Sequence, residues 1–492
     1  MEYELSGISQ PEEAPDVGAK IGLGAPRVVM AAPLGDTSWG SFNFPNMWGL
    51  RDGRLVCAVT IGQDEMSSDA DYHYLWYISD DEGEHWTHAV VDENEAERFL
   101  RERITLSNGR QLYYKPKMVS VDKLGCEPVP RFQGIGWKGM NVYYRLGEMD
   151  TECRSLDMYS RAPGESTWRK ERAMMDPDII VPAYKETVLE KDSVLGPTHS
   201  AIGTHLRRLI QYVGDDRLPA LGIQEIQDDQ PPHLGPLDRP GFSIHNASWG
   251  VSPEELTASR ARNLAIRVQI PSPLGCRLHD YPLLPIMELA DGTLMTTSYY
   301  FPAPASGMRI IRKNGELDTG SKSNLFKSVD GGATWSYHCS VPFEKLGERQ
   351  VVLAHITPNM PRGNWAAMLR TTGDESTENS PLMATRSYDQ GQTWSTPEAI
   401  RPSSVNPVGG LLSNGVAFRM YGRPGQYMTF CTDGEGKEWG NDVTLTHGGS
   451  CANSCTYITG ANRLMVVYSD YAYRDARNRR RKAIVSRQIV AE

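Results

Sequence analysis

Short runs rich in apolar and β-branched residues recur along the chain, separated by turns rich in Asp, Gly and Ser. Segments such as Tyr74–Ile78, Asn324–Lys327 and Leu382–Arg386 have the length and composition of β-strands. Asp-Gly dipeptides at 52–53 and 291–292 join two such segments each, which is a hairpin signature. The pattern predicts an all-β protein assembled from successive hairpins.

One polar turn recurs in the form Ser-x-Asp-x-Gly-x-x-Trp. Three copies are intact, at residues 79–86, 328–335 and 387–394, and a fourth at 432–439 is shifted at its Asp. In a tight hairpin the Ser and Asp side chains accept backbone N–H hydrogen bonds, Gly supplies a positive φ, and Trp covers the turn. The last three tryptophans are 59 and 45 residues apart, a period typical of β-propellers, in which two hairpins make one four-stranded blade.

Dividing the chain into blades gives one β-propeller domain over residues 27–492, preceded by an N-terminal extension at 1–26. The segment Arg27–Ala32 is expected to supply the last strand of the final blade and close the ring, which removes exposed sheet edges. A Pro- and Asp-rich stretch indicates a long insertion around residues 213–280, which leaves six blades as the alternative to seven. The favoured seven blades lie at residues 44–91, 103–173, 199–270, 283–337, 352–396, 409–447 and 453–489.

The recurring turn resembles the Asp box of sialidases and other BNR-repeat proteins, and the likeness extends over most of residues 27–490. The resemblance implies a sialidase-like β-propeller with a carbohydrate as substrate or ligand. In that family the Asp boxes lie on the rim of the blades, away from the pocket. They therefore indicate the fold rather than the reaction.

The residues that sialidases use for catalysis are changed in this chain. Asn43 stands where the resemblance places the family's first arginine, and Asn453 stands at the position of its nucleophilic tyrosine. Glu288 resembles the family's glutamate, but the arginine expected after the following strand is Tyr299. A neutral side chain cannot replace the bidentate grip of arginine on a carboxylate. The chain thus resembles a divergent member that lacks the usual arginine triad and nucleophilic tyrosine.

Further polar residues are expected to face the central pocket. Arg370 and Arg423 end second strands and would bind an anionic group, with an inter-blade salt bridge as the structural alternative. The loop of the first blade carries Asp64, Asp71 and His73 where sialidases carry their acid/base Asp. The candidates for catalysis are His73, Asp71, Asp64, Tyr299, Glu288 and His199, and those for substrate binding are Arg370, Arg423, Asn43, His279 and Asn453.

These candidates support three functions. The first is an exo-acting glycoside hydrolase on a terminal, acidic sugar, with its acid/base among Asp64, Asp71 and His73. The second is a lyase acting next to a uronic acid, in which an arginine neutralises the carboxylate while His73 and Tyr299 transfer protons. The third is a glycan-binding propeller without catalysis. Hydrolysis takes up water, elimination creates a double bond, and binding alone does neither.

The formal net charge of −10 argues against a nucleic-acid partner, because phosphate binding needs surplus Lys and Arg. The loop 471–482 is nevertheless strongly basic, and at the rim of the pocket it would favour an anionic glycan.

The sequence has no 18-residue apolar run and no signal-peptide pattern. This predicts no membrane association and a cytoplasmic location, or a secreted or periplasmic one if a leader has been removed. It contains no cofactor or metal motif, although pocket oxygens would suit a structural or pocket calcium. The sequence does not decide the oligomeric state.

Overall fold

The computed structural model describes the chain from residue 19 to residue 492 with gaps. The described residues are 19–32, 34, 43–50, 53–60, 74–89, 104–115, 117–129, 133–136, 139–188, 245–249, 251, 254, 256–257, 265–270, 273, 286–298, 324–341, 351–371, 381–402, 406–422, 425–447, 449–450 and 452–492.

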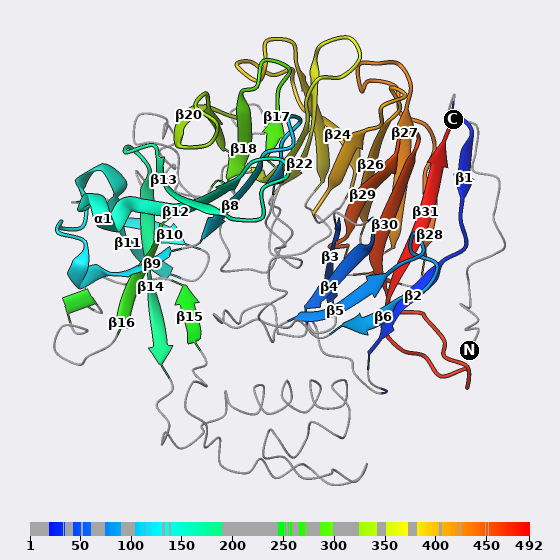
Figure 1. Cartoon of the computed structure of the whole chain (residues 1–492), viewed down its shortest axis with the longest axis horizontal. Helices are drawn as coiled ribbons and strands as arrows, with labels where there is room; N and C mark the ends of the chain where they lie inside the picture. Colours follow the sequence, from blue (N-terminus) through cyan, green and yellow to red (C-terminus); the bar gives the residue numbers. More distant parts are fainter. Residues whose placement is uncertain are drawn as a thin grey trace, which may run out of the picture.

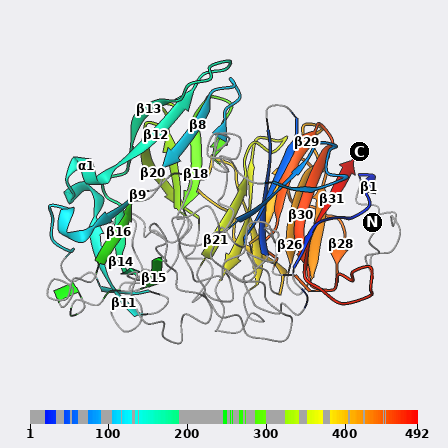
Figure 2. The same ribbon diagram turned by 60° about the horizontal axis from the view of Figure 1, so that its bottom comes forward.

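The repeating unit is a four-stranded antiparallel meander. In blade I it comprises β3 (Asn43–Gly49), β4 (Leu55–Thr60), β5 (Tyr74–Ser79) and β6 (Thr87–Ala89), each paired with the next. The described residues contain six such units, which follow one another along an arc in Figure 1 and Figure 2.

The other five units share this strand order. Blade II is β7 (Ile104–Thr105), β8 (Gln111–Lys115), β12 (Ser155–Arg161) and β13 (Arg169–Met175), and blade III is β17 (Met287–Glu288), β18 (Leu294–Ser298), β19 (Asn324–Ser328) and β20 (Thr334–Ser340). Blade IV is β21 (Val351–Thr357), β22 (Trp365–Thr371), β23 (Leu382–Ser387) and β24 (Glu398–Arg401), and blade V is β25 (Val408–Leu411), β26 (Ala417–Gly422), β27 (Gln426–Cys431) and β28 (Val443–Thr446). Blade VI is β29 (Cys455–Gly460), β30 (Arg463–Asp470), β31 (Ala483–Ala491) and β2 (Arg27–Ala31).

The N-terminal strand completes the last blade, as the sequence predicts. β2 pairs antiparallel with β31, and β1 (Ile21–Leu23) pairs with the other end of the same strand. Blade VI then packs on blade I through a shared apolar cluster that includes Met30, Cys57 and Val467. The two ends of the chain are therefore joined in one sheet, and no long edge of β31 is left unpaired.

The Asp-box turns show which blades are neighbours, because each packs against the preceding blade. The Trp86 Nε1–H of blade I donates to Ser486 Oγ of blade VI at 2.9 Å. A Cβ added to Gly391 of blade IV would lie 2.9 Å from the Trp365 ring of its own blade and 3.6 Å from Leu325 of blade III. The Tyr114 hydroxyl of blade II donates to the carbonyl of Gly332 in blade III at 2.9 Å. Blades II and III are therefore direct neighbours, although more than a hundred residues separate them in sequence.

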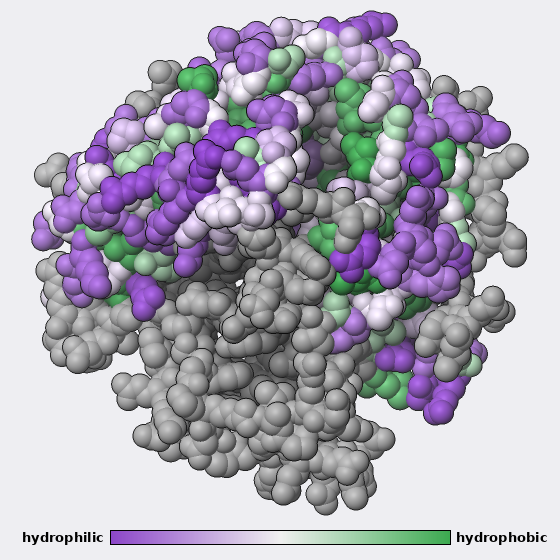
Figure 3. Space-filling model, in the orientation of Figure 1, coloured by the Kyte–Doolittle hydropathy of each residue, from purple (hydrophilic) through white to green (hydrophobic). Residues whose placement is uncertain are grey.

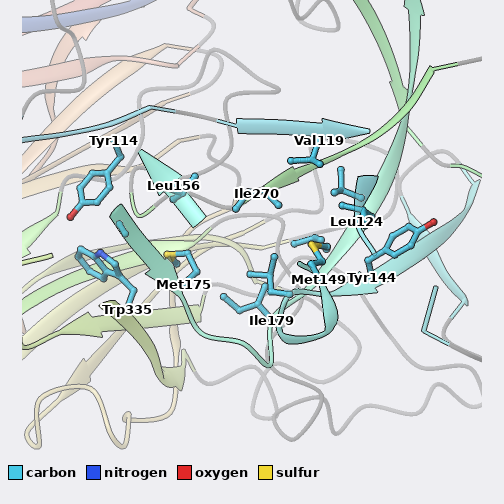
Figure 4. Packing of buried hydrophobic residues seen from close by; sticks show 14 of the residues in the cluster. Tyr114, Val119, Leu124, Tyr144, Met149, Leu156, Met175, Ile179, Ile270 and Trp335 are labelled. Atoms are coloured by element: carbon cyan, nitrogen blue, oxygen red, sulfur yellow. The ribbon is translucent and has the colours of Figure 1, made fainter. Parts of the chain in front are cut away.

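Two connections form a second sheet, one between β8 and β12 inside blade II and the other between blades II and III. It contains β9 (Lys117–Ser120), β10 (Gln133–Gly136), β11 (Gly139–Arg145), β14 (Ile180–Val188), β15 (His245–Trp249) and β16 (Ala265–Ile270), in the order β10-β11-β14-β16-β9 with β15 beside β14. Short helices η3 (Val121–Lys123), η4 (Leu146–Glu148) and α1 (Thr151–Arg154) flank it. Its core is continuous with that of blades II and III, from Tyr144 and Met149 to Tyr114 and Trp335 (Figure 4).

This inserted sheet changes the blade count that the sequence favours. The described strands of the expected blade at 199–270, β15 and β16, pair with β14 and β9 instead of forming a meander of their own. Seven blades are not confirmed, and the described residues favour the six-bladed alternative. The remainder of that expected blade, 199–244, lies outside the described residues.

Hydrophilic side chains cover much of the outer surface in Figure 3, as on the β12–β13 hairpin with its ion pair between Lys170 and Asp157.

The Asp boxes have the hydrogen bonds expected from their sequence. In blade IV, Ser387 Oγ accepts from Gly391 N–H at 2.7 Å, and Asp389 accepts from Thr393 N–H at 2.7 Å. The hydroxyl and the backbone N–H of Thr393 lower the pKa of Asp389. In the shifted copy of blade V, Cys431 takes the place of Ser, with its Sγ 3.0 Å from Asp433, and the turn is one residue longer.

The third residue after the Ser has a left-handed backbone in every intact copy. Gln390 has φ +57° and Glu82 also has φ +57°, whereas blade III has Gly331 there, at φ +70°. A residue with a Cβ loses roughly 1–2 kcal/mol in this conformation.

We expect Gln390→Gly to stabilise the protein by up to about 1 kcal/mol, because relief of the Cβ strain outweighs the added freedom of the unfolded chain. Denaturant unfolding would measure this. Gln390→Ala is the matched control, since it removes the same exposed side chain but keeps the Cβ. Equal stability of the two variants would contradict the strain argument.

A buried histidine joins the innermost strands of blades IV and V. His355 Nε2 accepts from Gly409 N–H at 3.3 Å, and only 6% of the residue is exposed. Desolvation by burial lowers the pKa of His355 to about 4.

Because the folded pKa is depressed, the stability contributed by neutral His355 is present above the unfolded pKa near 6.5 and is lost as pH falls toward 4. The loss amounts to about 3 kcal/mol at most. Replacing His355 with Gln keeps an acceptor for Gly409, and we expect it to flatten this part of the stability profile in denaturant titrations. A slope between pH 6.5 and 4 that His355→Gln leaves unchanged would refute the assignment.

Candidate functional site

The innermost strand of each blade begins, and its second strand ends, on the same side of the ring. Antiparallel pairing shows this: Asn43 lies opposite Thr60 in blade I, and Cys455 lies opposite Val467 in blade VI. We call this side the mouth face. Asp boxes follow third strands and lie on the other side. The two connections that build the inserted sheet leave blade II on the mouth face as well.

Asn43 and Tyr471 form a contact between blades I and VI on the mouth face. Asn43 is the first residue of β3 and is 0% exposed, and its Oδ1 accepts a hydrogen bond from the Tyr471 hydroxyl at 3.2 Å. No described residue accepts a hydrogen bond from Asn43 Nδ2. The backbone of Tyr471 is fixed as well, since its N–H donates to Gly449 O and its carbonyl accepts from Arg480 Nε. A buried amide donor therefore lies at the start of blade I.

Beside this contact lies a group of buried polar side chains that we call the seam cluster: Gln426, Ser450, Asn453, Ser454 and Ser469. The Gln426 amide donates to Ser454 Oγ at 3.3 Å and accepts from Ser450 Oγ at 3.4 Å. Ser450 and Ser469 are 3.1 Å apart, oxygen to oxygen. Most buried polar groups in proteins are bonded in this way. The seam cluster connects blade V with blade VI.

Asp470 ends β30 next to the seam cluster and is 2% exposed. Burial raises the pKa of its carboxyl above the usual range, although the Ala472 N–H at 2.8 Å, the Thr446 side chain and the charge of Arg480 act in the opposite direction. Burial thus shifts this carboxyl in the direction that a general acid needs. Asp470 was not predicted from the sequence; its position as the last residue of a second strand was the available signal.

Three of the seven left-handed non-glycine residues among those described lie where innermost strands begin. Phe44, Asn406 and Ala452 have φ of +50°, +45° and +58°, at the starts of β3, β25 and β29. All three are buried, and none is glycine. Each left-handed non-glycine residue costs about 1–3 kcal/mol, and such residues persist where surrounding contacts fix them, often at binding sites. Blades V, VI and I thus share a rigid, strained rim.

Arg370 lies on the mouth face of blade IV, as its sequence position suggested. It is the penultimate residue of β22, it is partly exposed, and no described residue forms an ion pair with it. Its cross-strand partner Leu382 pairs in turn with Arg401, whose guanidinium binds Asp442 and the Tyr421 hydroxyl. Arg401 is neutralised within the fold, whereas no described carboxylate pairs with Arg370.

Glu288 occupies a different part of the molecule. It precedes the hairpin turn at the Asp-box end of blade III, where its carboxylate accepts from Ser107 N–H at 2.5 Å and from Ser107 Oγ at 2.8 Å. Its position therefore supports a role in joining blades II and III, and we leave it out of the proposed site. The sequence placed it near the pocket because it resembles the glutamate of the sialidase family.

Of the predicted site residues, the structure places Asn43 and Asn453 on neighbouring blades of the mouth face and Arg370 on the same face two blades away from Asn453. Seven others lie outside the described residues: Asp64, Asp71, His73, His199, His279, Tyr299 and Arg423. Within the part of the chain that the structure describes, no three His, Cys, Asp or Glu side chains are grouped as metal ligands would be, and no helix has the length and hydrophobicity to cross a bilayer.

Because the folded pKa of Asp470 is raised, the fold is penalised for holding it charged, and stability falls as pH rises above the unfolded pKa near 4. We expect Asp470→Asn to fold and to gain more stability at pH 8 than at pH 5. Thermal unfolding at the two pH values tests this. A uniform loss at both would mean that the carboxylate is held ionised.

The fold of this chain can be compared with known proteins. No family model and no curated protein matches it. Among solved structures, a protein of unknown function from Dyadobacter fermentans is 14% identical over 95% of this chain and 99% of its own, with a TM-score of 0.46. An α-L-arabinanase from Penicillium chrysogenum is 12% identical over 94% and 98%, with a TM-score of 0.40. The NanB sialidase of Streptococcus pneumoniae is 14% identical over 94% and 70%, with a TM-score of 0.41. These likenesses concern the fold alone.

Proposed function

We propose that this chain is an exo-acting glycoside hydrolase of sialidase-like fold that removes a terminal, acidic sugar from an oligosaccharide. The observation that carries the proposal is the buried carboxyl of Asp470 beside amide and hydroxyl groups on the mouth face. Sugar hydroxyls are recognised by such groups, and glycoside hydrolysis needs a protonated carboxyl at the leaving oxygen.

Four described residues would have roles in this reaction. Asp470 would donate the proton, and the amides of Asn43 and Asn453 would orient the sugar hydroxyls. Arg370 would pair with the sugar carboxylate, since no described residue neutralises it. The second carboxylate required for hydrolysis is proposed among Asp64 and Asp71 of the first-blade loop, with His73 as the alternative base.

The test is to incubate purified protein with a panel of acidic oligosaccharides and to analyse the products by mass spectrometry. Release of a terminal sugar with the gain of one water supports the proposal. An ultraviolet-absorbing unsaturated product would instead identify a lyase. Saturable binding without any product would identify a glycan-binding propeller.

With a substrate in hand, Arg370→Gln should raise KM for the acidic sugar about 10- to 100-fold, the usual value of a hydrogen bond to a charged group. The kcat/KM of the Arg370→Gln variant for the corresponding neutral sugar should equal that of the wild type. Asp470→Asn should lower kcat about 10²- to 10⁴-fold while the protein stays folded. Arg463→Gln is the control, because Arg463 is an exposed arginine at the Asp-box end of blade VI, where it pairs with Glu82. Wild-type kinetics of Arg370→Gln or Asp470→Asn would remove that residue from the site.

A further inference from the structure

The connection between β30 and β31, residues 471–482, is the most basic segment among the described residues. Six of its side chains are basic, Arg474, Arg477, Arg479, Arg480, Arg481 and Lys482, against a single carboxylate, Asp475. The chain as a whole has a net charge of −10. A surplus of this size on one loop of an acidic protein raises the question of what neutralises it.

The loop is held in a fixed shape by its one acid. Asp475 accepts from the backbone N–H of Arg477 at 3.0 Å and of Arg479 at 2.9 Å, and from Arg479 Nε at 2.8 Å. Arg481 Nε donates at 2.8 Å to the carbonyl of Ala32, just after the ring-closing strand. Two of the arginines are therefore structural, and they make the loop rigid enough to present the others.

Of the other arginines, Arg474 and Arg480 donate to carbonyls within the loop, those of Asn478 at 2.9 Å and Tyr471 at 2.8 Å. Arg474 and Arg480 lie directly opposite one another across an antiparallel bridge. Like charges in that arrangement repel. Arg477 is exposed, and among the described residues no carboxylate pairs with Arg474 or Arg477. The charges of Arg474 and Arg477 are thus held on the loop without a carboxylate partner among the described residues.

This loop is connected to the proposed site. Arg480 Nε donates to the carbonyl of Tyr471, whose hydroxyl binds Asn43. The charge of Arg480 also acts on the neighbouring Asp470 carboxyl, where it partly offsets the rise in pKa caused by burial. In Figure 1 and Figure 2 the loop is the red segment beyond the mouth-face ends of β30 and β31. A ligand that occupied the mouth face and continued outward would reach it.

We infer that the 471–482 loop binds negative groups of a polyanionic oligosaccharide that continues outward from the mouth face, so that the preferred substrate carries charges on several successive sugars. The inference rests on the proposed function for the sugar in the site, but the loop's binding of polyanions does not depend on turnover. Nucleic acid is the less suitable polyanion. The chain has a net charge of −10, and the loop's Tyr473 is 1% exposed and therefore cannot stack on bases.

The experiment measures dissociation constants of the full-length protein by fluorescence anisotropy with four labelled probes of matched length. These are an oligogalacturonate, a sulfated chondroitin oligosaccharide, a neutral xylo-oligosaccharide and a single-stranded RNA. We expect the acidic glycans to bind more tightly than the neutral glycan and to weaken steeply from 50 to 200 mM salt, as exposed charges are screened.

The double variant Arg474→Gln/Arg477→Gln should weaken acidic-glycan binding about fivefold or more at low salt, corresponding to about 0.5 kcal/mol for each exposed charge. Arg463→Gln on the opposite side of blade VI should leave binding unchanged, although it also removes an exposed arginine. A melting temperature equal to that of the wild type would confirm that the loop still folds.

Equal affinity for the neutral glycan, or equal effects of the double variant and Arg463→Gln, would overturn the inference. So would tighter binding of the RNA than of either acidic glycan. If acidic glycans bind through the loop but no product is released, the proposed hydrolase fails while the inference about the loop is retained. If a short acidic substrate is cleaved but the loop variants bind longer acidic glycans as tightly as the wild type, the inference about the loop fails while the proposed hydrolase is retained.

Discussion

The packing of one blade on the next depends on the Asp-box turns. In each turn a carboxylate accepts hydrogen bonds from backbone N–H groups of the same turn. In blade IV, Asp389 holds the turn closed through Thr393 while Ser387 holds the glycine. The closed turn then lies against the previous blade, as the Trp86 indole of blade I does against Ser486. The same hydrogen bonds lower the pKa of the carboxyl. Desolvation raises the pKa of Asp81, but the backbone and ring of His85 and the Ser79 hydroxyl outweigh it and lower the pKa to about 2. The ring is thus held together by short, local turns whose side chains act on a neighbour.

Local chemistry of this kind is what can be predicted from a sequence. The Ser, Asp, Gly and Trp of each box lie within eight residues, so their spacing alone specifies the turn. The closing strand at 27–31 was predicted because an incomplete last blade requires one. The inserted sheet was not predicted, because β9 and β16 pair across about 150 residues and no local pattern encodes that pairing. It forms because two long connections leave blade II on the same side.

The candidate site divides in the same way. The positions of Asn43, Asn453 and Arg370 follow from where strands begin and end, and the structure places all three on the mouth face. Asp470 and Tyr471 were missed because their significance depends on burial and on a partner some 400 residues away. Glu288 was predicted from its resemblance to the family's glutamate, but the hairpin places it at the other end of its blade, bonded to Ser107.

The charges on the mouth face are arranged by exposure. At full burial a guanidinium at position 43 would need a buried counter-charge, and truncated or unmatched buried charges are strongly destabilising. Asn43 is neutral, fully buried and bonded to Tyr471, so the start of blade I is stable without a ligand. Positive charge is found instead where water can solvate it, on Arg370 and on Arg474, Arg477 and Arg480 of the loop 471–482. The interaction of each exposed charge with a ligand is weak and is screened by salt. Several such charges therefore select a ligand by the number of its charges rather than by the geometry of a single ion pair. A mouth built in this way suits a ligand with several charges better than one with a single buried carboxylate.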